Sequence, residues 1–327
     1  MKRTFYIACA CVVLSGNIFS QTYRELMAHA DSLYTLKEYK KSSEVYQQAF
    51  TVEAKNPNDL YNGACAVALA GEIEKAFALL DLAVVHGWTD VDHTKIDSDL
   101  DTLHSSPKWS PFIAAMQKKH DDIEAKLDKP LQKQLLEIFQ EDQTTRRQTM
   151  EYAKKYGWEN PTMDSLQKIT SYKDSIDLIK VVNILDRYGW VGKEKVGGQA
   201  NQTLFLVIQH SDLKTQQKYL PMMREAVKKG NADASALALL EDRVALGEGR
   251  KQIFGSQIGR NLKTNKYYVN PLEDPDNVDK RRAGVGLEPL ANYVQRWDIV
   301  WNVEEYKKQL PEIEKWYQEL MEHYKSH

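Results

Sequence analysis

The side chains best suited to chemistry in this chain gather around one histidine, His210. It follows an apolar run, residues 204–208, and stands in the short sequence Gln209-His210-Ser211-Asp212. An imidazole titrates near neutral pH, so His210 is the best candidate for acid–base chemistry. A carboxylate can orient such an imidazole, and Asp242 and Asp142 are the candidates for that role.

Further polar side chains in the same half of the chain suit contact with a ligand. Arginine offers paired N–H donors to an anionic group, and an amide both donates and accepts. A glycine lets the backbone approach a ligand closely. The set favours a polar, hydroxylated or carboxylated small molecule. The ligand-binding candidates are Arg146, Gln209, Asp212, Gln216, Arg243, Gln252, Gly255, Gln257 and Arg282.

The same residues can instead form a closed network inside the protein. Asp242 and Arg243 can pair with Arg146 and Asp142 as buried struts, and His210 can cap a helix. Polar groups are costly to bury unless they are paired, so such a region is either a network or a site. The sequence leaves both interpretations open.

Metal and cofactor motifs are missing from the sequence. One histidine without a nearby cysteine does not make a zinc set, and the acidic stretch 273–279 lacks the order of a calcium-binding loop. There is no glycine-rich phosphate loop, no serine elbow and no His-Glu-x-x-His motif. We therefore expect no metal and no cofactor.

Composition narrows the class of protein. The 327 residues are 42% hydrophobic and 28% charged, an ordinary globular composition with room for two domains. The formal net charge is −2, so no charge excess indicates nucleic acid as a partner.

The amino terminus predicts export. Lys2 and Arg3 precede a short apolar run, residues 5–14, that is too short to span a membrane. We expect a signal peptide over residues 1–20, a periplasmic or secreted protein, and no stable membrane span after cleavage. The mature chain would keep Cys65 alone, in an alanine- and valine-rich helix where a small buried hydrophobe is expected.

A repeat occupies the next segment. Residues 37–50 match residues 71–84 at an offset of 34, with small residues such as Ser42 and Ala76 in register. This period and pattern resemble the tetratricopeptide repeat. The resemblance covers residues 22 to about 88 and implies helical hairpins with a concave groove for a protein partner. Two repeats leave apolar surface uncovered, and residues 97–127 are expected to cap them, so this domain is expected over residues 21–127. Structural support for the rest of the chain is the alternative role.

The second half, residues 128–327, predicts a separate, mostly helical domain. Its helical patterns cover 131–156, 163–188, 200–210, 213–229, 232–246, 289–306 and a final segment to 325, and a small hairpin is expected from 251–256 and 267–269. Pro221 should kink or interrupt its helix.

The polar motifs of this half resemble a bacterial domain family of unknown function. Its hallmarks are a Gln-His-x-Asp motif, here residues 209–212, and a Gln-x-x-Gly-x-Gln motif, here residues 252–257. The resemblance covers about residues 131–306 and implies a mostly α-helical domain without an assigned activity. We thus expect a mainly α protein that binds a protein or a polar ligand, with a hydrolase that uses His210 and an aspartate as the alternative.

Overall fold

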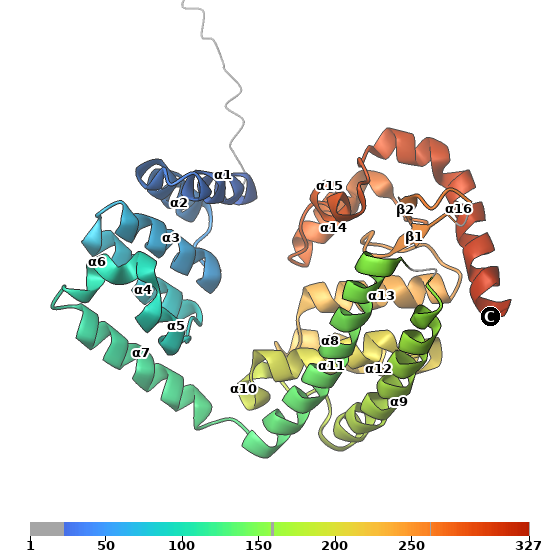
Figure 1. The fold of residues 1–327 in the computed structure, drawn as a ribbon, viewed down its shortest axis with the longest axis horizontal. Coiled ribbons are helices and arrows are strands. Elements are labelled where there is room, and N and C mark those ends of the chain that lie inside the picture. Colours follow the sequence, from blue (N-terminus) through green and yellow to red (C-terminus); the bar gives the residue numbers. More distant parts are fainter. Residues whose placement is uncertain (1–22, 158–159, 262, 327) are drawn as a thin grey trace, which may run out of the picture. The chain divides into compact units, whose positions relative to one another are not determined.

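The chain forms two compact helical units, Met1–Ala125 and Lys126–His327 (Figure 1). A computed structural model describes residues 23–157, 160–261 and 263–326. The expected signal peptide over residues 1–20 lies outside the described residues. The predicted class is confirmed, since the described residues are mainly helical with one small antiparallel hairpin.

The first unit begins with two helical hairpins. Their helices are α1 Tyr23–Thr35, α2 Tyr39–Val52, α3 Pro57–Leu69 and α4 Ile73–His86. The matching helices begin 34 positions apart, as the repeat predicted. Small residues lie where the helices cross: Ala30, Ser42, Ala49, Ala64, Ala76 and Ala83 are all fully buried. The hydroxyl of Ser42 donates to the carbonyl oxygen of Ala30 at 2.9 Å, which satisfies that buried group. This arrangement of helices is consistent with helical repeats in the first unit.

The remaining helices of this unit cover the second hairpin. They are α5 Val91–Ile96, the 3-10 turn η1 Ser98–Leu100, α6 Asp101–His104 and α7 Trp109–Glu124. Leu100, Leu103, Phe112 and Met116 join the core of α3 and α4. These contacts supply apolar surface that two isolated hairpins would leave open to water.

The second unit is built on six helices that share one core. They are α8 Lys129–Tyr156, α9 Thr162–Tyr188, α10 Lys193–Val196, α11 Gly198–His210, α12 Leu213–Lys228 and α13 Ala234–Gly247. Apolar residues at helical spacing, such as Leu135, Val181 and Leu204, fill the space between them. Helix α12 runs through Pro221 without a break, contrary to an interruption there. The proline is exposed, so water can reach the carbonyl that loses its partner.

The carboxyl-terminal part of this unit adds a second core. Its elements are β1 Ile258–Arg260, β2 Tyr267–Val269, the turns η2 Pro275–Asn277 and η3 Val294–Trp297, and helices α14 Val278–Gly284, α15 Leu290–Tyr293 and α16 Val303–Ser326. Strands β1 and β2 pair antiparallel, with Gly259 opposite Tyr268. Leu272, Leu290, Val294 and Tyr306 pack together beneath them.

Two predicted elements of this part are wrong in detail. The first strand of the hairpin is residues 258–260 and not 251–256. Side chains, and not a second strand, accept from four backbone N–H groups there, those of Ile253, Phe254, Ser256 and Gln257. The expected helix over 289–306 is divided. Asp298 ends its first part with a left-handed φ of 56°, and α16 begins only at Val303.

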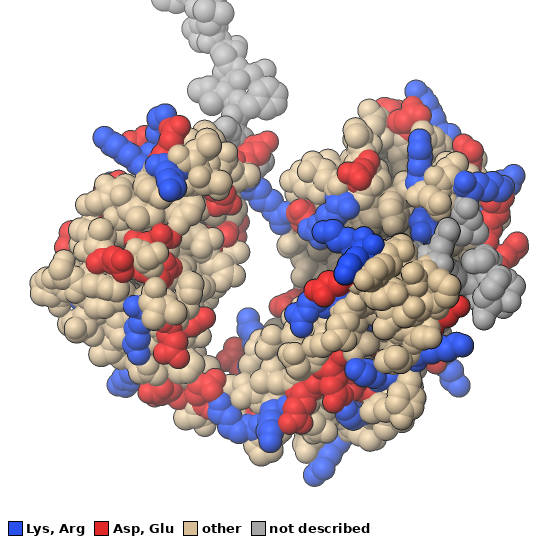
Figure 2. All heavy atoms as spheres, in the orientation of Figure 1, with Lys and Arg blue, Asp and Glu red and all other residues tan. Residues whose placement is uncertain are grey.

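The described surface carries charges of both signs. Figure 2 shows acidic and basic side chains interspersed on the drawn face of each unit. In the described part of the chain, no helix has both the length and the apolar character that crossing a membrane requires.

Candidate functional site

An imidazole–carboxylate pair lies at the centre of the predicted polar region. Helix α11 ends at His210, and Ser211 continues in an extended conformation. The ring Nδ1 of His210 lies 3.2 Å from Oδ1 of Asp142, on helix α8. Asp142 is 3% exposed, whereas the side chain of His210 keeps 19% of its surface exposed. The carboxylate is therefore internal, and the imidazole lies between it and solvent.

Two further side chains hold Asp142 in place. Arg146, one helical turn later, approaches Oδ1 of Asp142 with Nε at 3.1 Å and Nη2 at 3.0 Å. The amide of Gln143 donates to Oδ2 at 2.7 Å. Burial alone would raise the pKa of Asp142, but the hydrogen bonds from His210 and Arg146 and their charges lower it to about 2. Asp142 is thus an anion at neutral pH.

The charge of Asp142 determines that Nδ1 of the His210 ring carries a proton. A carboxylate only accepts hydrogen bonds, so Nδ1 of His210 must carry the proton in this contact. In the neutral ring, Nε2 is then a hydrogen-bond acceptor. Among the described residues, no group hydrogen-bonds to that Nε2. The pair can accept a proton or a hydrogen bond from a molecule next to it.

A cavity of about 200 Å³ adjoins the pair. It lies among helices α8, α9 and α11. Three carboxyl groups, one imidazole and three serines line it together with two apolar residues: Asp142, Ser171, Asp174, Ser175, Asp177, Leu178, Val207, His210 and Ser211. The walls therefore offer mainly hydrogen-bond acceptors and hydroxyl groups.

Two acidic residues of helix α9, missed in the sequence, complete this wall. Asp174 accepts from Nη2 of Arg146 at 2.8 Å, so that arginine is shared between two carboxylates. Asp177 is 1% exposed, pairs with Lys180 at 3.1 Å, and has an Oδ2 without a partner among the described residues. Burial is the main cause that raises the pKa of Asp177. Their spacing of three residues is the only signal in the sequence, and it is also typical of a solvated helical face.

The Gln-His-x-Asp segment mainly makes structural contacts. Asp212 caps α12 by accepting from the backbone N–H of Thr215 at 2.7 Å. The amide of Gln216 donates to the main-chain oxygens of Gln209 and Ser211, at 3.0 and 2.8 Å. Gln209 contributes its backbone carbonyl here. These bonds fix the turn that carries His210.

Asp242 lies in a different group of contacts. Its carboxylate accepts from three backbone N–H groups, those of Ile253, Phe254 and Ser256, at 2.6, 2.9 and 2.9 Å. It is fully buried, and burial raises its pKa while the three backbone donors oppose that rise. Asp242 organises a loop, and Asp142 is the residue that orients His210.

The two glutamines of the second motif hold the same loop. The amide of Gln252 donates to the carbonyl oxygens of Gln257 and Asn270, and its Oε1 accepts from the N–H of Gln257. Gly255 has φ of 68°, and a Cβ there would lie 3.1 Å from Leu290. The left-handed φ and the close packing both favour glycine.

The two remaining arginines differ in their contacts. Arg282 is 1% exposed and donates to the carbonyl oxygens of Glu288 and Phe254, at 2.5 and 2.6 Å. Arg243 has an Nε that is buried without a partner among the described residues. Burial lowers the pKa of Arg243, and the positive charge of Arg146 lowers it further. Only Arg146 of the predicted arginines contacts Asp142.

Comparisons with known proteins add a family. No curated protein and no solved structure matches the chain. Residues 129–304 match the model of a family of unknown function, DUF6624. That stretch holds both groups of contacts described above and more than half of the chain. The chain therefore belongs to the DUF6624 family of unknown function.

Proposed function

We propose that the second unit binds a small polar molecule in the cavity beside His210. The observation that carries this proposal is the contact between Nδ1 of His210 and the buried Asp142 at the wall of that cavity. It leaves Nε2 as an acceptor without a described partner. In a strut buried on all sides, both ring nitrogens would need protein partners, whereas the side chain of His210 is 19% exposed.

The lining indicates the chemistry of the ligand. Asp174 and Asp177 add carboxyl oxygens to the acceptor of His210, while Arg146 is already engaged by two carboxylates. Such a wall favours hydroxyl or amino groups, which donate hydrogen bonds, over an anionic group. A hydroxylated or aminated small molecule is therefore the proposed ligand class.

The test uses the full chain and a panel of sugars, polyols and amino sugars. Binding is measured by calorimetry for the wild type, for His210→Ala and for the matched control His29→Ala, which removes an exposed histidine of the first unit. The proposal expects that the wild type and His29→Ala bind one panel member with equal affinity. His210→Ala should bind the same molecule at least about tenfold more weakly, because one good hydrogen bond is lost. Equal binding by all three proteins would refute the site.

A hydrolase is the second candidate, supported by the same contact. An imidazole oriented by a carboxylate at Nδ1 can remove a proton through Nε2. Ser211 donates its hydroxyl to the carbonyl oxygen of Ile208 at 2.6 Å and is thus engaged elsewhere. Water would be the molecule that His210 activates. Hydrolysis of the glycosidic bond in a glycoside of a bound panel member, lost in His210→Gln although binding persists, would favour the hydrolase over the binding protein.

We propose that the whole chain is exported. For the first unit we also propose a role in docking a protein partner. The docking role is supported by the helical repeat and by a cavity of about 420 Å³ lined by residues of both hairpins and of the α5–η1 segment. Affinity capture with the full chain tests this role. Asn62→Arg places a bulky charge at the cavity, and Ala114→Arg introduces the same side chain at an exposed position of α7. If both substitutions changed the amount of captured partner equally, the proposal would be contradicted.

A further inference from the structure

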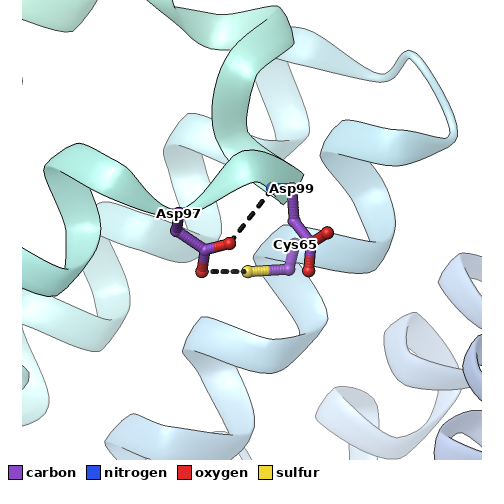
Figure 3. Close-up of side chains that lie close together, drawn as sticks. All are labelled: Cys65, Asp97 and Asp99. Carbon is purple, nitrogen blue, oxygen red and sulfur yellow. Dashed lines mark hydrogen bonds between the residues drawn. The ribbon is translucent and has the colours of Figure 1, made fainter.

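The cavity of the first unit has an unusual lining. Three of its residues are aspartates, and none is lysine or arginine: Asp31, Tyr34, Thr35, Tyr46, Tyr61, Asn62, Cys65, Trp88, His93, Asp97 and Asp99. Figure 3 shows Asp97 and Asp99 on the segment that contains η1, facing Cys65 on α3. The ligand atoms of these three residues lie within 4.8 Å of one another. Carboxylates gathered in one cavity favour a positively charged occupant.

Each aspartate of the cavity is positioned by a tyrosine hydroxyl. Tyr61 donates to Oδ2 of Asp97 at 2.7 Å. Tyr34 donates to Asp99, and Tyr46 donates to Asp31. These bonds orient the carboxylates without neutralising them, because a phenol is uncharged at neutral pH. Burial, together with the bonded aspartate, raises the pKa of all three tyrosines.

One wall of the cavity is aromatic. The rings of Tyr61 and Trp88 stack with centroids 4.0 Å apart and an interplanar angle of 18°. The indole N–H of Trp88 donates to Thr94 at 2.9 Å, which fixes the ring. Aromatic faces attract cations and also cover the methylene groups of a long side chain. Carboxylates and an aromatic wall therefore occur together in this cavity.

We propose that this cavity binds the primary ammonium group of a lysine side chain of a protein partner. An ammonium has three donors that point in different directions, which suits carboxylates from separate elements: Asp31 belongs to α1, and Asp97 and Asp99 belong to the η1 segment. The lysine methylenes lie along Trp88, the half-buried ring of this wall. This inference narrows the docking role proposed above to one chemical group and is independent of His210.

A metal ion is the competing occupant, and without a bound ion the thiol of Cys65 is not ready to bind one. A cysteine binds metal as a thiolate. Burial, followed by the charges of Asp97 and Asp99, raises the pKa of Cys65, which keeps the thiol protonated. Its Sγ lies 3.7 Å from Oδ2 of Asp97, as a donor to that oxygen (Figure 3).

Calorimetry on the full chain tests the proposal with small probes, so it does not depend on finding a protein partner. The probes are Nα-acetyl-lysine methylamide, its Nε-acetylated form, 1,5-diaminopentane and Zn²⁺ alone. The variants are Asp97→Asn and Asp99→Asn. The matched control is Asp92→Asn, which makes the same change in the same segment at a side chain that is 98% exposed.

The proposal expects saturable binding of the lysine probe and at least about tenfold weaker binding of its Nε-acetylated form, since the charged donor is lost. Asp97→Asn and Asp99→Asn should each weaken the lysine probe to a similar extent, and Asp92→Asn should not. Equal binding of the charged and acetylated probes overturns the proposal, and this comparison needs only the wild type. Tighter binding of 1,5-diaminopentane than of the lysine probe also overturns the proposal. Binding of Zn²⁺ that prevents binding of the lysine probe overturns it as well. Lysine binding without capture of any protein would leave this site standing and contradict only the docking role.

Discussion

Nδ1 of His210 and Oδ1 of Asp142 lie 3.2 Å apart although 68 positions separate the two residues in the chain. The contact joins the end of α11 to the middle of α8, and it turns the second ring nitrogen away from the carboxylate. It combines a structural bond with an acceptor that a ligand can use. Unfolding measurements and ligand titrations separate these two contributions.

Acid should weaken the contribution of Asp142 to stability. Its pKa is about 2 in the folded protein and about 4 in an unfolded chain. A carboxyl group whose pKa is lowered by folding stabilises the folded protein at any pH above its pKa in the unfolded chain. This stabilisation is lost as the pH falls through the pKa in the folded protein. The ionisation of Asp142 therefore contributes about 2–3 kcal/mol at pH 7. About half of this should be gone near pH 3.

Urea unfolding of the wild type and Asp142→Asn at neutral pH and near pH 3 measures this contribution. The difference between the two proteins should shrink in acid. Asp92→Asn, at a 98% exposed position, serves as the control for a general loss of charge. A difference that stays constant across this pH range would contradict the assigned pKa.

The sequence could identify His210 but not choose its partner. Asp142 and Asp242 were equal candidates, since the choice depends on how α8 packs against α11, which local pattern does not encode. Asp242 binds three backbone N–H groups, and no residue type in the sequence marks such donors. Asp174 and Asp177 look like a solvated face of a helix until α9 is placed beside His210. Helices with regular apolar spacing, such as α8 and α9, were predicted to within two residues at each end.

Removing the carboxylate of Asp242 should destabilise the loop that follows α13. Asp242→Ala leaves three N–H groups without this acceptor, two of them buried, at a cost of about 1–3 kcal/mol for each buried group. Asp242→Asn keeps one oxygen, which can still accept from Ile253 and Phe254, so its cost should be smaller. Free energies of unfolding from urea titrations compare the two variants. Equal costs would show that the hydrogen bonds to this loop are not the source of the effect.

Gly255 should tolerate alanine worse than Gly249 does. Both have left-handed φ, 68° and 76°, but only at Gly255 would a Cβ come within 3.1 Å of Leu290. Each alanine costs about 1 kcal/mol for backbone strain, and Gly255→Ala adds the displacement of Leu290. Thermal melts of the two variants test this order. A smaller fall in melting temperature for Gly255→Ala than for Gly249→Ala would contradict the packing of Leu290 against Gly255.

The small residues between the repeat helices should resist enlargement. Ala76 is fully buried on α4, whereas Ala78 on the same helix is exposed. Ala76→Leu should cost about 1–3 kcal/mol or more through overpacking, and Ala78→Leu should cost little. Both variants have the same composition, so unfolding in urea compares position alone. Similar stabilities would argue against close helix packing at Ala76.

The central claim, that His210 faces a ligand site, is tested most directly by nitrogen NMR of the histidine rings in the full chain. The protein is titrated with the panel of sugars, polyols and amino sugars, and the exposed His29 serves as an internal reference. The account predicts that a panel member shifts the Nε2 signal of His210 in a saturable way, leaves the proton on Nδ1 as the donor to Asp142, and leaves His29 unchanged. A His210 signal that no panel member moves, together with a loss of about 1–3 kcal/mol of stability in His210→Ala, would identify the pair as an internal strut and contradict the account.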